Sequence, residues 1–572
     1  MSNLTVAPWA AVARPQRWDE PFGKMSPEAV DDLLQKKPFC DFDPERFPKH
    51  LPLRDILLND ARIRTFADGE IVMREGDYGT SAFLILEGSV RVFLDKLPAR
   101  MLGRKVKRKR SPFSAVAQIW NRPKFSETRT SVGASAQSNK STSQAPESQI
   151  FIQDIPAALT AKLRHLDLDQ SGELIGELAA LSRTPRTATV VANGTVEMLE
   201  IRWQGLREFR SFAPEWKRRI DELFRERSLE THLLKSPLFA GLSKEALDCV
   251  MEATILESYG SFDWHDSFRK MRETADGQPH ASEPKILAEG DYPNSLILVR
   301  NGFVRVSRRY NNGERTVNYL GAGQSYGMRE LSESFETGSP IKYQHSLRAL
   351  GYVDLLVIPA AVVEDYIIPA LSEDQRRKMS QNEPFAVSST SESKEPLDHT
   401  VEFLVEHRFI NGTQSMLIDL DRCTRCDDCV RACASTHEGN PRFIRQGPQD
   451  GTTMFANACM HCSDPVCMIG CPTGAIHRAE STGEVVINDL TCVGCQTCAN
   501  SCPYNNIHMV EVRSRSGDIL LDQDASPILK ATKCDLCSEQ LTGPACERAC
   551  PHDALIRMDM RKPLKLKRWL TR

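Results

Sequence analysis

Residues 492–503 read CVGCQTCANSCP: four cysteines separated by two, two and three residues, with a proline after the last. Three further groups of four cysteines lie on either side of this run, and of the chain's 18 cysteines only Cys40 and Cys249 stand outside the four groups. A two-residue spacing lets a tight loop present three sulfur atoms to one metal centre, and the fourth sulfur atom then points the other way. The groups, named motifs I to IV, are Cys423, Cys426, Cys429 and Cys433; Cys459, Cys462, Cys467 and Cys471; Cys492, Cys495, Cys498 and Cys502; and Cys534, Cys537, Cys546 and Cys550.

This spacing is typical of bacterial [4Fe–4S] ferredoxins, where the fourth cysteine ligates a neighbouring cluster. Structural zinc sites use isolated CxxC pairs, and a disulfide framework belongs to secreted chains. Covalent haem needs a histidine directly after CxxC, and no motif has one. At four thiolates per cluster, the motifs predict four [4Fe–4S] clusters and a chain that conducts electrons. Motif I departs slightly, because Ala434 follows its last cysteine where the others have proline.

Composition and charge narrow the class of protein. The length of 572 residues predicts about three or four domains. A net charge of −3 gives no reason to expect a nucleic-acid partner. No run of about 18 apolar residues predicts a membrane span, and the N-terminal residues show no export signal. Because cluster-binding thiols must stay reduced, we expect a cytoplasmic protein; export bound to a partner that carries a signal is the alternative.

Two regions before the cysteines repeat one plan. Residues 73–92, MREGDYGTSAFLILEGSVRV, parallel residues 287–306, LAEGDYPNSLILVRNGFVRV. Alternating apolar and polar residues between glycine turns predict short antiparallel strands closed into a roll. The expected fold class is therefore multidomain α+β: two jelly-roll-like β-rolls with flanking helices, then a double bacterial-ferredoxin-like iron–sulfur domain.

The remaining segments are expected to connect these domains. The run RKVKRKR and the Ser/Gln-rich stretch after it predict a disordered insertion within the first roll. That basic run could dock an acidic partner or simply be solvated, and the basic tail with Trp569 could dock a partner or fray. The predicted boundaries are 1–50, an extended N-terminal arm; 51–232, the first roll, with the insertion at about 95–163 and a helical stretch from 203; 233–376, the second roll; 377–400, a linker; 401–560, the iron–sulfur domain; and 561–572, the basic tail.

The first roll contains GELAALSRTPRTAT at residues 176–189. A short helix that starts near Gly176 would aim backbone N–H groups at an anion. Arg186 could give a phosphate a bidentate hydrogen bond, and Glu177 could accept from a hydroxyl. An ordinary ion pair between the two side chains is the alternative.

These residues resemble the phosphate-binding cassette of cyclic-nucleotide-binding domains. The resemblance implies that Glu177 binds the ribose 2′-hydroxyl and Arg186 the cyclic phosphate of cAMP or cGMP, and that residues 203–232 cover the base. It also implies that amides of Leu178, Ala179 and Thr187 complete the site. The second roll departs from the pattern: Glu330 remains, but Lys342, Tyr343 or Gln344 stands where the arginine is expected. We expect the second roll to be structural or to bind another ligand.

Residues 415–560 resemble the four-cluster electron-transfer subunits of dimethyl sulfoxide reductase, formate dehydrogenase and related molybdenum oxidoreductases, motif by motif. In such subunits motifs I and IV build one lobe and motifs II and III another. Cys495 stands where some relatives have tryptophan and a three-iron cluster. The implied ligand sets are Cys423, Cys426, Cys429 and Cys550; Cys534, Cys537, Cys546 and Cys433; Cys459, Cys462, Cys467 and Cys502; and Cys492, Cys495, Cys498 and Cys471.

No catalytic motif accompanies the cysteines. We expect an electron-transfer subunit of a larger oxidoreductase, with a cyclic-nucleotide-type module that senses or docks. A flavin, molybdenum or hydrogenase partner is implied, and the chain is expected to have no catalytic centre of its own. A redox- or nucleotide-responsive regulator is one alternative, although no helix-turn-helix follows either roll. Rolls that act only as scaffold are another. Four histidines near the motifs are expected to be exposed or to lie beside the clusters rather than to bind iron: His461, His477, His508 and His552.

Overall fold

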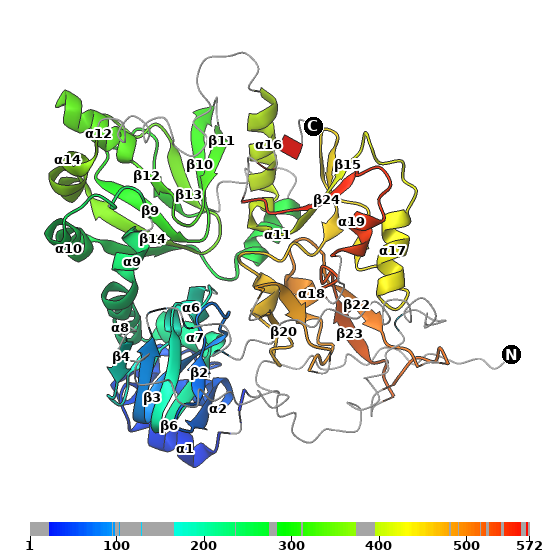
Figure 1. Ribbon diagram of the computed structural model, residues 1–572, viewed down its shortest axis with the longest axis horizontal. Helices are drawn as coiled ribbons and strands as arrows, with labels where there is room; N and C mark the ends of the chain where they lie inside the picture. Colours follow the sequence, from blue (N-terminus) through cyan, green and yellow to red (C-terminus); the bar gives the residue numbers. More distant parts are fainter. Residues whose placement is uncertain are drawn as a thin grey trace. The chain divides into compact units, whose positions relative to one another are not determined.

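The computed structural model divides into two compact units, and each unit joins segments that are distant in the sequence. The first unit contains residues 1–217, 430–442 and 467–545, and the second contains the rest. The structure describes residues 22–23, 25–93, 95, 97, 102, 127, 165–182, 184–234, 236–273, 283–310, 313–372, 395–479, 482–489, 491–514, 516–521, 525–538, 543–561, 565 and 568–569. Across these residues the fold is mixed α+β (Figure 1).

The first roll is a six-stranded antiparallel sheet in the first unit. Its long strands β3 and β6 pair along most of their length, and both are largely buried toward their ends with a more exposed stretch in the middle. Gly88 lies in the left-handed region, where a Cβ would approach the Thr195 carbonyl oxygen to 2.6 Å. The strands are β1 (Ala61–Phe66), β2 (Ile71–Met73), β3 (Ser81–Phe93), β4 (His165–Leu168), β5 (Leu174–Ile175) and β6 (Thr189–Arg202).

The prediction of an extended N-terminal arm is wrong for the part that the structure describes, residues 22–23 and 25–50. Helix α1 (Pro27–Leu34) begins there, because Ser26 accepts a hydrogen bond from the Ala29 amide and Pro27 suits the first helical position. Two short 3₁₀ helices follow, η1 (Phe39–Asp41) and η2 (Pro44–Arg46). Residues 53–60, at the start of the predicted first roll, form a helix instead of a strand, α2 (Leu53–Asp60), with Ile56 and Leu57 fully buried.

The predicted disordered insertion has at least one fixed point. Glu127 is 3% exposed, and its carboxylate pairs with Arg442 at 3.1 Å and accepts a hydrogen bond from Asn440 at 2.6 Å. Its amide donates to the Glu438 carbonyl oxygen. The insertion is therefore anchored at Glu127 beside the segment that follows motif I. The basic run at residues 104–110 lies outside the described residues.

The second roll consists of two four-stranded antiparallel sheets in the second unit, with strand orders β11-β10-β13-β8 and β12-β9-β14-β7. Buried Val, Leu, Ile and Tyr side chains fill the space between them. The strands are β7 (Ile255–Tyr259), β8 (Lys285–Leu287), β9 (Ser295–Asn301), β10 (Val304–Tyr310), β11 (Gly313–Leu320), β12 (Ser325–Tyr326), β13 (Ser346–Ala349) and β14 (Val353–Pro359).

Helices accompany both rolls, and helices occupy the predicted stretch 203–232. Among the described residues, no helix combines the length and apolarity needed to cross a bilayer. The helices are α6 (Glu177–Ser182), α7 (Trp203–Phe212), α8 (Pro214–Phe224), η3 (Arg225–Leu229), α9 (Glu230–Leu234), α10 (Lys244–Ala253), α11 (Trp264–Glu273), α12 (Met328–Thr337), α13 (Ala360–Val362), η4 (Val363–Ile367) and α14 (Ile368–Ala370).

The cysteine-rich region consists of small sheets and short helices joined by cysteine-bearing loops. β15 and β24 pair in the second unit, whereas β20–β21 and β22–β23 form ribbons in the first (Figure 1). The elements are α16 (Glu395–Glu406), η5 (Phe409–Asn411), β15 (Ser415–Asp419), α17 (Asp428–Thr436), β16 (Phe443–Ile444), β17 (Gln449–Asp450), β18 (Thr453–Phe455), β19 (Asn457–Ala458), η6 (Val466–Met468), β20 (Ile476–Arg478), β21 (Val485–Ile487), α18 (Thr497–Ser501), β22 (His508–Glu511), β23 (Leu529–Thr532), α19 (Ala545–Arg548) and β24 (Leu555–Met558).

Two further predictions fall mainly outside the described residues. The linker is described only from residue 395, where α16 begins. Of the basic tail, residues 561, 565, 568 and 569 are described, and Trp569 is 7% exposed.

Candidate metal centres and nucleotide cassette

The same backbone bend recurs in all four cysteine motifs. The residue before the second cysteine has a positive φ in each: Arg425 (60°), His461 (47°), Gly494 (72°) and Leu536 (59°). L-residues other than glycine seldom adopt this conformation. This bend curls the CxxC loop, and in motifs I and III the three leading cysteines line one cavity. It also gives His461 a backbone role in its loop.

In the first unit, the three leading cysteines of motif III meet the last cysteine of motif II. Cys492, Cys495 and Cys498 line one cavity together with Cys471. Apolar side chains such as Ile476 complete the wall. Burial and the neighbouring cysteines Cys471, Cys492 and Cys495 raise the pKa of the Cys498 thiol to about 12. Four thiolates this close repel one another, so their side chains suit a cationic metal core.

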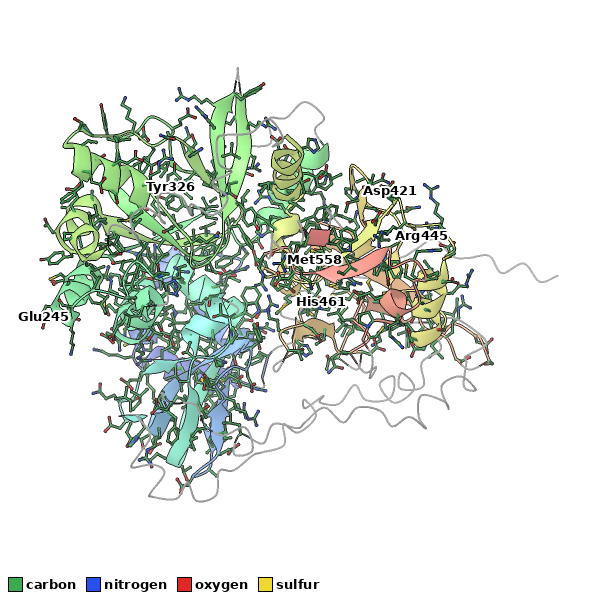
Figure 2. The ribbon with its side chains drawn as sticks, turned by 45° about the horizontal axis from the view of Figure 1, so that its top comes forward. Glu245, Tyr326, Asp421, Arg445, His461 and Met558 are labelled. Carbon is green, nitrogen blue, oxygen red and sulfur yellow. The ribbon has the colours of Figure 1, made fainter. Side chains whose placement is uncertain are left out.

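In the second unit, motif I meets the last cysteine of motif IV. Cys423, Cys426, Cys429 and Cys550 line a second cavity. The guanidinium of Arg445, labelled in Figure 2, lies in its wall and forms a 2.7 Å ion pair with Asp427. Cys426 is exposed, so this loop reaches solvent. Both cavities contain the cysteine sets that the resemblance implies.

Backbone amides donate to cysteine sulfur atoms in several of the loops. The Ala554 amide lies 3.3 Å from Cys550 Sγ, and the Ala545 amide lies 3.5 Å from Cys537 Sγ. Amide donors of this kind favour a thiolate over a thiol and suit sulfur atoms that bind metal. Similar contacts join Arg442 N to Cys433 Sγ at 3.2 Å and Asn506 N to Cys502 Sγ at 3.4 Å.

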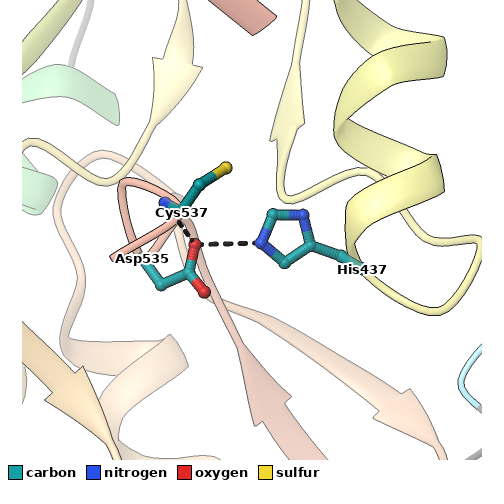
Figure 3. A group of neighbouring side chains, drawn as sticks. All are labelled: His437, Asp535 and Cys537. Carbon is teal, nitrogen blue, oxygen red and sulfur yellow. Dashed lines mark hydrogen bonds and ion pairs between the residues drawn. The ribbon is translucent and has the colours of Figure 1, made fainter. Parts of the chain in front are cut away.

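His437, which motif spacing alone did not single out, lies beside motif IV. Its Nε2 lies 2.9 Å from an Asp535 carboxylate oxygen, and Cys537 is close by (Figure 3). Its Nδ1 lies 2.8 Å from the Cys433 carbonyl oxygen. Burial opposes the imidazolium charge, but the hydrogen bonds to Asp535 and Cys433 outweigh it and raise the His437 pKa to about 11.

The four histidines singled out from the sequence occupy different surroundings. His552 lines the same cavity as the motif I cysteines. His477 Nδ1 lies 3.1 Å from the Ala475 carbonyl oxygen, and half-burial lowers the pKa of His508. His461 is fully buried in its loop.

The structure brings the predicted cassette residues of the first roll together. Gly176 precedes the six-residue helix α6, which buries Glu177 and Ala179. The Arg186 guanidinium, 6% exposed, donates to the Gly176 carbonyl oxygen at 2.7 Å and to that of Ser81 at 2.6 Å. Of the other two predicted residues, Leu178 is half-buried and Thr187 is exposed.

The same backbone connections identify the equivalent residue in the second roll. Gly76 N donates to Arg186 O at 2.7 Å, and Arg186 N donates to Asp77 O at 2.8 Å. In the second roll Gly290 N donates to Tyr343 O, and Tyr343 N to Asp291 O, each at 2.9 Å. Of the three residues left open by the sequence, Tyr343 therefore takes the arginine's place.

The second cassette also differs at the carboxylate position. Ile175 pairs with Phe83 and Tyr326 pairs with Ile297 in equivalent registers, so the residue after Gly327 matches Glu177. That residue is Met328, whereas Glu330 lies two positions further along α12. The second roll thus lacks both charged side chains at the positions they occupy in the first.

Within the first unit, the first cassette also contacts the cysteine-rich region. Tyr78 follows Asp77 and bridges to Pro185, next to Arg186. The guanidinium of Arg478, at the end of β20, lies 5.3 Å from the centre of the Tyr78 ring. A Cβ at Gly483 would come within 2.5 Å of the same ring. The ribbon β20–β21 therefore packs against the edge of the cassette.

Comparisons with known families identify two domain types. A model of the 4Fe-4S dicluster domain matches residues 450–560, and a model of the cyclic nucleotide-binding domain matches residues 283–368. These matches confirm both predicted domain types. Among solved structures, the regulatory domain of Toxoplasma gondii PKA with cAMP is 13% identical at a TM-score of 0.21, over 62% of this chain and 94% of that one. A structural similarity this weak supports no conclusion about this chain.

Curated relatives match about a quarter of the chain. Hydrogenase-4 component A of Escherichia coli (strain K12) is 31% identical over 158 residues, 23% of this chain and 76% of that protein. Electron transport protein HydN of the same strain is 33% identical over 160 residues, 26% of this chain and 89% of that protein. Through these residues the chain belongs to the family of electron-transport proteins that includes HydN.

Proposed function

We propose that this chain is the electron-transfer subunit of a larger oxidoreductase and holds four [4Fe–4S] clusters with the sixteen motif cysteines. The observation that carries the proposal is the pair of cavities, each lined by three cysteines of one motif and the last cysteine of another. When bound, the clusters would supply one-electron transfer. The loops hold the sulfur atoms in place, and apolar side chains such as Ile476 limit water at the cavity of the first unit. A redox partner of the flavin, molybdenum or hydrogenase type is implied, in a cytoplasmic setting.

Anaerobic purification tests this function directly. Iron and acid-labile sulfide analysis should give about sixteen iron atoms per chain. Cys498→Ser should cost about one cluster, because Cys498 lines the cavity in the first unit. Cys249→Ser is the matched control and should leave the iron content unchanged. A zinc-rich, colourless preparation would contradict the proposal.

We further propose that the first roll binds cAMP or cGMP, and that the presence or absence of the bound nucleotide is relayed to the iron–sulfur region. The support is the cassette chemistry together with the Tyr78 contacts to Arg478 and Gly483. A cyclic phosphate would compete with the carbonyl oxygens that now hold the Arg186 guanidinium. Calorimetric titration of the full chain with each nucleotide tests this, and the absence of heat from both would remove the sensing role.

For the second roll we propose a scaffold role. Tyr343 replaces the arginine, and its hydroxyl donates to the Ser295 carbonyl oxygen at 2.7 Å. Its ring belongs to the roll's hydrophobic core. Without a guanidinium at this position, an anionic ligand has no strong partner there.

A further inference from the structure

Two buried lysines flank the iron–sulfur region of the first unit. Lys530, on β23, is 5% exposed, and Lys533, just after the strand, is 6% exposed. Lys530 Nζ donates to the backbone carbonyl oxygens of Cys492 at 2.5 Å and Asp489 at 2.9 Å. Lysine side chains are rarely this buried without a specific role.

Lys533 makes the same kind of contact in the next motif. Its Nζ donates to the Cys534 carbonyl oxygen at 3.1 Å and also to that of Val485. Cys492 and Cys534 are the first cysteines of motifs III and IV. Each lysine therefore binds the peptide group of a leading cysteine.

Both lysines contact segments that line one cavity or pack beside it. Cys492 lines the cavity of the first unit, and Ala531, which lies between the two lysines in sequence, lines it as well. Val485 packs in the same hydrophobic cluster as Cys471 and Cys498. The two positively charged side chains are thus held by residues that line the four-cysteine cavity or pack in its neighbourhood.

The second unit repeats the arrangement once, whereas motif I differs. Arg557, 7% exposed and on β24, donates to the carbonyl oxygen of Cys459, the first cysteine of motif II, at 3.3 Å. Beside motif I, the half-exposed Arg445 instead pairs with the carboxylate of Asp427. Buried cations on leading cysteines are therefore a feature of motifs II, III and IV.

These buried cations should change the reduction potential of a nearby cluster through their charge. Burying an ammonium group costs several kcal/mol, and carbonyl dipoles offset only part of that cost. A cluster held by four thiolates is net negative and gains a further negative charge on reduction. A fixed positive charge nearby stabilises the reduced form more than the oxidised form, which raises the reduction potential.

We propose that Lys530 and Lys533 are buried counter-charges for the site formed by Cys471, Cys492, Cys495 and Cys498, and that they raise its reduction potential. This inference rests on the proposed [4Fe–4S] function of those cysteines. Neither lysine binds the metal. Both are positioning residues that hold a charge and a cysteine peptide group in fixed places.

Paired variants of the full-length chain separate charge from hydrogen bonding. Lys530→Gln keeps a donor for the Cys492 carbonyl oxygen but removes the charge, and Lys530→Arg keeps the charge. The same pair at Lys533 tests the second lysine, and Lys244→Gln, at an exposed lysine, is the control. Redox titration monitored by electron paramagnetic resonance should show one cluster shifted to lower potential in each Gln variant. A tenfold change in its reduction equilibrium equals about 59 mV for one electron.

The possible outcomes are distinguishable. Iron analysis of the wild-type chain comes first, because a chain without iron contradicts the proposed function itself, whatever the lysines do. Gln variants with full iron content and unchanged potentials would overturn the role of the lysines. If the Gln variants lose iron while the Arg variants retain it, the need for a positive charge is supported. If both lose iron, the lysines act through shape alone and the proposal fails.

Discussion

The two rolls share a backbone plan but differ in the side chain at its centre. Arg186 and Tyr343 make equivalent backbone hydrogen bonds, and each side chain donates to an equivalent carbonyl oxygen, that of Ser81 or Ser295. Architecture and ligand chemistry are therefore separable in this fold. The cyclic nucleotide-binding model matches residues 283–368, the roll that has the tyrosine. A family match thus reports the backbone plan rather than the anion-binding side chain.

The two rolls also differ at the residue that packs against this central side chain in the first roll. A Cβ at Gly79 would lie 2.0 Å from Arg186 Cζ, so the guanidinium occupies the space that a side chain would need. The aligned position in the second roll is Pro293. Only the first roll keeps this space open for an arginine.

The largest expected effect is on the core of the second roll. Tyr343→Ala removes a buried ring and should destabilise this roll by about 3 kcal/mol or more. Hydrogen exchange of the full chain, read on peptides from β9 and β13, measures the loss. Tyr343→Phe, which loses only the hydroxyl, should cost about 1 kcal/mol. Equal protection in wild type and Tyr343→Ala would show that the tyrosine is not part of the core.

The next effect concerns ligand binding by the first roll. Arg186→Ala should weaken cyclic nucleotide binding by about 2 kcal/mol, roughly thirtyfold, because a charged hydrogen-bond partner of the phosphate is lost. Calorimetry measures the affinity. Tyr343→Phe is the control and should leave the affinity unchanged. Retained affinity in Arg186→Ala would place nucleotide binding elsewhere.

A smaller effect is expected at Gly79. Gly79→Ala would displace the Arg186 side chain and break its hydrogen bonds to Gly176 and Ser81, at a cost of about 1 kcal/mol to the local stability of the cassette. Hydrogen exchange of residues 174–190 would report it. In the second roll, Pro293→Ala should leave exchange near Tyr343 unchanged. Unaltered protection in Gly79→Ala would mean that the arginine finds an equivalent place.

The smallest effect is a pH dependence confined to the second roll. Burial, with Arg308 and Arg329, lowers the pKa of His345, against a weaker opposite effect of Glu289. A lowered folded-state pKa means that the unfolded chain binds the proton more readily. The stability that the neutral His345 side chain contributes to this roll is therefore present above about pH 6.5, and it is lost as the pH falls below that value. His345→Gln should flatten the profile of hydrogen exchange against pH in this roll; a wild-type profile without a slope would contradict the prediction.

Much of the iron–sulfur region could be predicted from the sequence, because cysteine spacing is a local signal. The pairing of Cys471 with motif III depends on long-range folding and followed only from family resemblance. His437 was missed because its partner Asp535 is 98 residues away. No local pattern connects the two.

The rolls were predictable in plan but not in detail. The repeated stretches gave the strands, yet the sequence left three candidates for the arginine's counterpart. The reason is physical: α12 has ten residues where α6 has six, so counting from the shared glycine does not locate Tyr343. The helix α1 did have a local signal, Ser26 followed by Pro27, which the proline-rich surroundings obscured.

The recurrent bend in the cysteine loops has a consequence for how the motifs mature. At Arg425, His461 and Leu536 a side chain tolerates a left-handed backbone, which stores about 1 kcal/mol or more at each position. Gly494 stores none, but its unfolded loop has more freedom to lose on ordering. At this bend motif III therefore meets the cost as entropy, although Gln496, two residues further on, also has a positive φ of 64°. We expect the bend at Gly494 to become ordered when the loop receives metal.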